Sequence, residues 1–326
     1  MLLVNLEPES LPNLKDKIIF VLGTVILAFT LLFSRCSFSV DAATYTELIN
    51  ASPRTTIGIG AAVIRQLTAE PNIKATPLKS DIEAKVVRGQ RRRAADPGLA
   101  PRTNGRDVLQ FRAGPLQDGA EAHGRVDHAV YSAGMAGPDE DGRLFDTVTA
   151  SPSSPIEEEP SMRVLDVNLR GALFFTRVAA HHLRESLAAA KGEGSVPGRE
   201  GETDDDAAPI LLVSSSNGIA GFAGRLQYCA GKHGILGLFR GARSTLSATG
   251  GGVGSRMNVV VPSVTSTQMI SKFLDTFASR GLMCKKPDDV SSAIAQALAS
   301  RADGEAYYVA GSKTYEIEKR LEALRA

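Results

Sequence analysis

The chain has 326 residues, of which 43% are hydrophobic and 22% are charged, and its formal net charge is +1. These values fit a soluble globular protein with a large core and exclude a disordered chain or a strongly basic nucleic-acid binder. The three cysteines are scattered, and the five histidines form no cluster beyond the neighbouring His181 and His182. The sequence therefore predicts no metal site and favours a reducing compartment, the cytoplasm.

The first half of the chain predicts strands that alternate with helices. Residues 1–16 are polar and are expected to be a disordered lead, whereas residues 17–326 should form one domain. Its first elements should be a strand at 16–23, a helix at 58–69, a second strand at 83–89, an edge-like third strand at 107–111, and a strand with its turn at 126–134.

The second half continues this alternation. It predicts a long amphipathic helix at 162–190, a flexible polar loop at about 191–208, a strand at 210–213, a helix after Arg225, a strand at 256–262, a helix at 288–300, a strand at 306–311 and a charged helix at 314–326. The strands are apolar runs, which is typical of a parallel sheet covered on both faces. We therefore expect an α/β fold, a doubly wound parallel sheet of Rossmann type, with ligands at the carboxyl ends of its strands.

One segment carries the clearest chemical signal. In "ILLVSSSNGIAGFAGRLQYCAGKHG", Ser215 follows an apolar strand, and Tyr228 precedes Lys232 by four positions on an expected helix. Positions four apart share a helix face, so the ammonium of Lys232 should lie beside the phenol of Tyr228 and lower its pKa from about 10. Such a tyrosine can exchange a proton near neutral pH, and Ser215 could hydrogen-bond the same substrate oxygen. The alternative is an ordinary surface pair.

These three residues at this spacing resemble the short-chain dehydrogenase/reductase family. The resemblance extends from about residue 14 to about residue 320, and the C-terminal part is most similar to relatives of 15-hydroxyprostaglandin dehydrogenase and to fungal alcohol-oxidising members. It implies an NAD(P)-dependent oxidoreductase that transfers a hydride between nicotinamide and a secondary alcohol or ketone. Tyr228 would be the general acid/base, Lys232 would also hold the nicotinamide ribose, and Ser215 would orient the substrate.

Further positions match motifs of this family. The turn "YSAG" matches the family's Asn-Asn-Ala-Gly-like turn only in Ala133 and Gly134, which would shape the adenine side of the cofactor cleft. The stretch "DVNLRG" supplies Asn168, which in such enzymes holds a water that contacts the active lysine; the alternative is an amide that packs helices together. The stretch "VPSVTST" supplies Pro262, and Thr267 stands where the family has a threonine that contacts the nicotinamide carboxamide.

The phosphate loop is the poorest match. The family has a glycine, three residues, a second glycine, any residue and a third glycine, which lets the backbone and a helix N-terminus approach the dinucleotide phosphates. Here 34 residues separate Gly23 from Gly58, Ile59 and Gly60.

The surplus residues form an insertion at about 24–55. It contains the second half of an apolar run that covers residues 18–33. One interpretation is translated intron sequence or another gene-model error. The other is a real N-terminal membrane anchor, which would remove the first strand from the sheet.

Cofactor choice is normally read at the end of the second strand, where a carboxylate binds the ribose hydroxyls of NAD. If residues 84–87 form that strand, Gln90 and Arg91 stand there, followed by two more arginines. Arginines suit a 2′-phosphate, which favours NADP over NAD. The alternative is a solvated basic loop.

The sequence thus predicts an enzyme whose partners are its cofactor and a small alcohol or carbonyl substrate. It predicts no nucleic-acid partner, and a membrane partner only if residues 18–33 are an anchor. Homo-oligomers are known in the family that the chain resembles. One rival interpretation is a non-catalytic dinucleotide-binding protein, whose interrupted phosphate loop has ended turnover. The other is a membrane-anchored reductase that acts on lipid-like substrates.

Overall fold

The computed structural model describes residues 2–4, 14, 17–22, 58–69, 74–78, 86–87, 108–109, 124–136, 161–191, 208–247, 254–279, 281–282 and 284–323. The strands are β1 (Leu2–Val4), β2 (Ile18–Leu22), β3 (Lys74–Leu78), β4 (Val86–Val87), β5 (Val108–Leu109), β6 (His128–Tyr131), β7 (Ala208–Val213), β8 (Ser255–Pro262), β9 (Ala306–Ala310) and β10 (Lys313–Glu316). The helices are α2 (Ile59–Ala69), α5 (Arg163–Leu165), the π-helical η2 (Asp166–Arg170), α6 (Gly171–Lys191), the 3-10 helix η4 (Ser216–Gly218), α7 (Leu226–Leu246), the 3-10 helix η5 (Gln268–Phe273), α8 (Leu274–Ser279), α9 (Pro287–Ala299) and α10 (Glu318–Ala323).

An eight-stranded sheet in the order β1-β10-β9-β8-β7-β6-β2-β3 forms the centre of the fold. Within this sheet β9, β8, β7, β6, β2 and β3 pair in parallel in that order, and β10 and β1 add an antiparallel edge. After β2, the chain first adds β3 next to one edge of β2 and later adds β6 next to the other edge. The direction in which strands are added therefore reverses between β2 and β6. The predicted doubly wound, Rossmann-type α/β fold is therefore confirmed.

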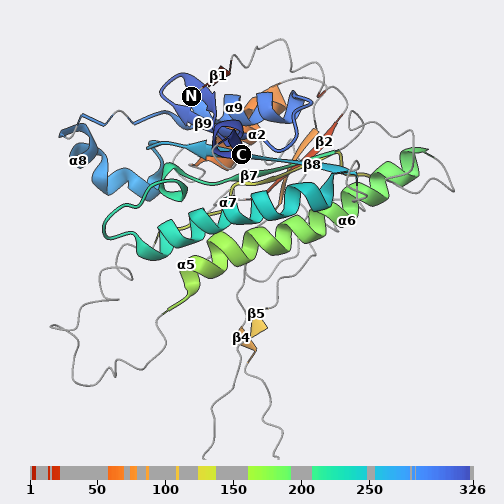
Figure 1. The fold of residues 1–326 in the computed structure, drawn as a ribbon, viewed down its shortest axis with the longest axis horizontal. Helices are drawn as coiled ribbons and strands as arrows, with labels where there is room; N and C mark the ends of the chain where they lie inside the picture. Colours follow the sequence, from red (N-terminus) through yellow and green to blue (C-terminus); the bar gives the residue numbers. More distant parts are fainter. Residues whose placement is uncertain are drawn as a thin grey trace, which may run out of the picture.

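Helices cover both faces of the sheet, with α5, α6 and α7 on one side and α2 and α9 on the other (Figure 1). Successive strand residues point to opposite faces, so Ile210 and Leu212 pack toward α6 and α7, whereas Leu211 and Val213 pack toward α2 and α9. Both faces are buried, which explains why the parallel strands are continuous apolar runs.

Several predicted elements need correction. The sheet strand that follows α2 is β3, whereas Val86–Val87, predicted as the second strand, pairs with Val108–Leu109, predicted as the third, in a separate two-stranded sheet. The predicted C-terminal helix begins only at Glu318, because Lys313–Glu316 pair with β9. Leu2–Val4, expected within a disordered lead, form the edge strand β1.

The apolar run near the N-terminus enters the sheet. Its first residues, Ile18–Leu22, form β2, which pairs with both β3 and β6. This disagrees with the anchor interpretation, which removes this strand from the sheet. Among the helices that the structure describes, none is both long and apolar enough to cross a membrane. The predicted insertion at 24–55 and most of the loop at 191–208 lie outside the described residues.

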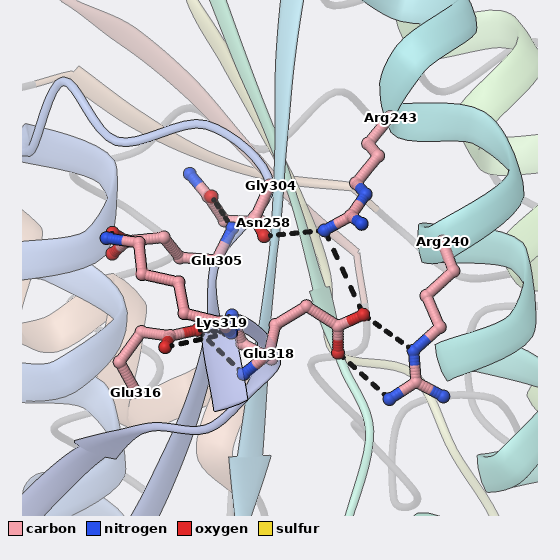
Figure 2. A network of polar contacts seen from close by, with 9 residues as sticks. Arg240, Arg243, Asn258, Gly304, Glu305, Glu316, Glu318 and Lys319 are labelled. Carbon is pink, nitrogen blue, oxygen red and sulfur yellow. Dashed lines mark hydrogen bonds and ion pairs between the residues drawn. The ribbon is translucent and has the colours of Figure 1, made fainter. Parts of the chain in front are cut away.

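A polar network ties the C-terminal helix to α7 (Figure 2). Glu318, whose side chain is 1% exposed, accepts hydrogen bonds of 2.8 and 2.9 Å from Arg240 and also lies 3.8 Å from Arg243. The neighbouring Glu316 accepts backbone hydrogen bonds from Glu318 and Lys319 at the start of α10. These carboxylates are buried with partners, as buried charges need to be.

His128 at the start of β6 is buried without such partners. It is 5% exposed, and among the residues that the structure describes neither ring nitrogen has a hydrogen-bond partner. Burial, and then the nearby charges of Lys17 and Arg256, lower the pKa of His128 from 6.5 to about 3. The folded protein therefore holds a neutral imidazole where an unfolded chain would bind a proton below pH 6.5.

We expect stability to fall with acid because of His128. Its folded pKa lies below its unfolded value, so its contribution is present above pH 6.5 and is lost as pH falls toward 3. Between about pH 7.5 and about pH 5 the unfolding free energy should decrease by about 2 kcal/mol more in the wild type than in His128→Leu. Urea denaturation at both pH values measures this, with the exposed His181→Gln as control; equal slopes in wild type and His128→Leu would contradict it.

Candidate functional site

The candidate site lies at the carboxyl edge of the sheet, where β7 passes into η4. Ser215 follows β7 with an extended backbone, and its hydroxyl accepts a 3.2 Å hydrogen bond from the Asn217 amide. This capping bond starts the turn η4. The chain then enters α7, which carries Tyr228 and Lys232 one turn apart. The structure thus brings the three predicted residues Ser215, Tyr228 and Lys232 onto two adjacent elements.

Tyr228 is half-buried and close to Ser215. Burial raises the pKa of the Tyr228 phenol above 10, while a side-chain hydrogen bond with Ser215 and the charge of Arg225 act in the opposite direction. The net direction is upward, so the predicted lowering of this pKa by Lys232 is not observed. The physical reason is that loss of water around the phenolate outweighs the nearby stabilising groups. At neutral pH, Tyr228 therefore carries its proton.

Lys232 is a buried member of the candidate site and is 4% exposed. Its Nζ donates a 2.9 Å hydrogen bond to the carbonyl of Val213 and lies 5.8 Å from the centre of the Tyr228 ring. Burial lowers the pKa of Lys232 to about 8. The carbonyl at the end of β7 thus fixes the ammonium beside the tyrosine, as the spacing of the two residues predicts.

Asn168 is fully buried in the π-helical segment η2 between α5 and α6. Its Oδ1 accepts a 2.8 Å hydrogen bond from the Met135 amide, and its Nδ2 donates a 2.9 Å hydrogen bond to the Met135 carbonyl. This pairing fixes the orientation of the side-chain amide and holds the segment that follows β6. A π turn within an α-helix frequently marks a functional site.

Gly134 lies next to both Lys232 and Asn168. A Cβ at Gly134 would lie 3.3 Å from Lys232 Nζ and 3.4 Å from Asn168 Oδ1. Both polar groups therefore border the same small volume at the end of β6. Gly134, which matches the family's turn together with Ala133, is thus a position where any side chain would crowd Lys232.

Glycines on α7 allow η2 to approach closely. A Cβ at Gly231 would lie only 2.9 Å from Asn168 Cβ, a contact that the backbone would have to relieve. A Cβ at Gly234 would lie 2.7 Å from Leu169 Cδ2, at the end of a flexible side chain. Sequence reasoning did not single out Gly231, because its requirement comes from a residue on another helix.

Tyr131 explains one departure from the family's turn. Its buried hydroxyl donates a 2.5 Å hydrogen bond to the Val167 carbonyl in η2, and its ring packs 5.2 Å from that of Phe175. Burial raises the pKa of Tyr131, so the hydroxyl stays a donor. This residue therefore links the end of β6 to the π segment that carries Asn168.

The other predicted residues are distributed along the same edge or lie outside the described residues. Pro262 ends β8, next to β7 in the sheet, and Thr267 precedes η5. Gly58, Ile59 and Gly60 lie at the start of α2. Gly23, Gln90 and Arg91 lie outside the described residues. The premise for Gln90 and Arg91 was wrong, because the strand at 86–87 does not belong to the main sheet.

The start of α2 fits a dinucleotide phosphate. Its first turn contains no acidic residue, and among the described residues no atom lies within 4 Å of a Cβ at Gly58. A helix N-terminus with open space and glycine backbone favours an anionic phosphate. The helix follows β2 along the chain, and β2 borders the point where the strand order reverses, which is where such sheets bind a dinucleotide.

A group of possible metal ligands occurs elsewhere, on α6. His181, His182 and Glu185 place one ligand atom each within 4.8 Å of one another. Glu185 oxygens lie 3.2 Å from His181 Nε2 and 3.4 Å from His182 Nδ1. Polar pairing along one helix face accounts for this arrangement.

The fold and the site define a Rossmann-type protein with a Ser–Tyr–Lys cluster at the carboxyl edge of its sheet. A model of the family described as short chain dehydrogenase matches residues 56–276. The chain belongs to this family.

The relatives agree with that assignment. The short-chain dehydrogenase/reductase ascJ of Acremonium egyptiacum is 29% identical over 207 residues, which is 63% of this chain and 62% of that relative's length. The chain thus spans about three fifths of this relative. Its curated relatives are named as dehydrogenases and reductases.

Solved structures share the fold. The 3-ketoacyl-(acyl-carrier-protein) reductase of Brucella melitensis, complexed with NADH, superimposes with a TM-score of 0.55 at 19% identity, covering 91% of this chain and 97% of that one. ElxO with NADP bound superimposes with a TM-score of 0.52 at 16% identity, covering 90% of this chain and 97% of that one.

The close packing of α7 on η2 predicts opposite effects for two alanine substitutions on α7. Gly231→Ala should destabilise the protein by about 1–3 kcal/mol, because its Cβ meets Asn168 Cβ. Gly237→Ala should stabilise it by up to about 1 kcal/mol, because no atom of the described part of the chain lies within 4 Å of that Cβ and alanine favours a helix. Unfolding midpoints in urea compare the pair; a Gly231→Ala protein as stable as Gly237→Ala would disprove the close approach.

Proposed function

We propose that this chain catalyses the transfer of a hydride between NAD(P) and the alcohol or ketone carbon of a small molecule, with Tyr228 as general acid/base. The observation that carries this proposal is the convergence of Ser215, Tyr228 and Lys232 at the carboxyl edge of the sheet. Membership of the short chain dehydrogenase family supports it.

The cofactor assignment rests on the similar structures and on the residues that fit it. One similar structure contains NADH and another contains NADP. In this chain, Gly58, Ile59 and Gly60 would receive the phosphates, and Lys232 would hold the nicotinamide ribose. Ala133 and Gly134 were expected on the adenine side, but Gly134 lies next to Lys232 and would instead border the ribose that the lysine holds. The preference for NADP depended on Gln90 and Arg91, whose predicted strand is not in the sheet, so we propose NAD(P) without a preference.

The bound cofactor supplies the hydride in reduction and accepts it in oxidation. In reduction, the Tyr228 hydroxyl gives its proton to the carbonyl oxygen, and Ser215 hydrogen-bonds the same oxygen. The Lys232 ammonium offsets the negative charge that develops on the phenol. Asn168 contributes by holding Met135 and the turn after β6, next to the lysine. The protonated state of Tyr228 suits the reductive direction.

Replacing the phenol oxygen tests the acid/base assignment. Tyr228→Phe should lower carbonyl reduction by about 100-fold or more, because no other described group replaces the proton donor. Its affinity for NADPH and NADH should stay close to that of the wild type. Absorbance of the reduced cofactor measures turnover, and the half-buried Tyr308→Phe on β9 is the matched control. Comparable turnover in Tyr228→Phe would refute the mechanism, and cofactor binding without turnover in the wild type would favour the non-catalytic alternative.

The pKa of Lys232 predicts the pH profile of reduction. The ammonium is charged at pH 7 and loses its proton as pH rises through about 8, whereas Tyr228 stays protonated in this range. The kcat/KM for ketone reduction should be constant below about pH 7.5 and should fall with one ionisation above about pH 8. Lys232→Met should have low activity without this ionisation. If the mutant keeps the same high-pH decrease, another group is responsible.

A further inference from the structure

Arg225 lies three residues before Tyr228, at the N-terminus of α7, and contacts no carboxylate within the part of the chain that the structure describes. It directly precedes the first residue of α7. Its guanidinium lies 5.0 Å from the centre of the Phe273 ring in η5. This cation–π contact holds the cation over an aromatic face but does not neutralise its charge.

The surroundings of Arg225 are apolar on two segments. Phe222, whose backbone carbonyl accepts a 3.2 Å hydrogen bond from the Arg225 amide, packs 6.5 Å from the ring of Phe277 in α8. Phe222 is 38% exposed and Met269, in η5, is 41% exposed, so apolar surface remains open on both segments. Figure 1 places α8 at the same end of the molecule as α5. A substrate in contact with these residues would meet mainly carbon surface.

The position of Arg225 ties this surface to the reactive group. Arg225 and Tyr228 are three residues apart at the start of one helix, and the charge of Arg225 acts on the pKa of the tyrosine. The first turn of α7 has no acidic residue and no side-chain cap, so it adds a positive helix end to the positive side chain. A cation next to apolar surface attracts an anion more strongly than one in open water.

We propose that Arg225 binds a carboxylate or similar anionic group of the substrate, and that the enzyme acts on apolar alcohols or ketones that carry such a group. This inference rests on the proposed function. Phe222, Phe273 and Phe277 contact the carbon part, Arg225 pairs with the anion through its planar guanidinium, and Tyr228 meets the reacting oxygen. The alternative role for Arg225 is purely structural, as a link between α7 and η5.

Matched probes separate these roles. The non-reacting pair 4-phenylbutanoate and 4-phenylbutanamide is closely matched in size, and only the first is charged; both are titrated into the full chain with saturating reduced cofactor. The reacting pair 4-oxo-4-phenylbutanoate and its methyl ester is compared by kcat/KM. In the wild type, each acid should be preferred over its neutral partner by about tenfold or more, because hydrogen bonds to charged groups are the stronger ones.

Arg225→Gln should bring the ratio of each acid to its neutral partner down to about one, whereas Arg225→Lys should keep part of the preference. The control is Arg184→Gln, an exposed arginine on α6 about 24 Å along the helix from Asn168. Circular dichroism and cofactor affinity verify folding. If Arg225→Gln fails to fold, the wild-type ratio and the Arg225→Lys ratio still decide.

The possible outcomes are distinct. No preference for the acids in the wild type, or equal losses for acids and neutral probes in Arg225→Gln, overturns the proposal and assigns Arg225 the structural role. Binding of 4-phenylbutanoate that depends on Arg225, without turnover of any ketone, supports the anion site and rejects the proposed redox function. Turnover of both ketones with an unchanged acid-to-ester ratio in Arg225→Gln rejects the anion site alone.

Discussion

The site depends on the close approach of α7 to the π segment η2. Gly231 offers no side chain, so Asn168 can lie against the helix that carries Tyr228 and Lys232. Asn168 then pairs with both backbone groups of Met135, which fixes the turn after β6, and Gly134 in that turn borders Lys232 Nζ. A helix, a π turn and a strand end are thereby held in one arrangement. Widening the helix contact would loosen all three together.

Burial acts on the two titratable groups of the site in the same sense, toward their neutral forms. It raises the pKa of Tyr228 and lowers that of Lys232 to about 8, so the ammonium is the stronger acid of the pair. In the proposed mechanism, the phenol keeps its proton until a substrate oxygen takes it, and the charged lysine then has an anion beside it. The interaction between phenolate and ammonium is therefore strongest during the reaction and weak at rest, which is the condition for an effect on rate rather than on binding.

The sequence predicted the relative positions of the candidate site residues better than the edges of the fold. Ser215, Tyr228 and Lys232 could be found because their spacing lies within one strand, turn and helix. β3 was missed because Lys74–Leu78 contains a proline and no apolar run, whereas Val86 and Val87 are apolar but pair only locally. Glu316 was assigned to a helix because the charged pattern of α10 continues back into β10. The direction of the Tyr228 pKa and the need for glycine at 231 depend on neighbours from distant segments, which spacing along the chain does not encode.

The bidentate pair of Arg240 and Glu318 can form only late in the synthesis of the chain. The two residues are 78 positions apart in the chain. At ordinary rates of translation, about 4 to 16 seconds pass between the synthesis of one and of the other. Throughout that interval, the helix that carries Tyr228 and Lys232 lacks Glu318 as the partner of Arg240. During synthesis α7 is therefore complete before its partner Glu318 exists. Factors that shelter apolar surface of the nascent chain should influence how much folded protein a cell obtains.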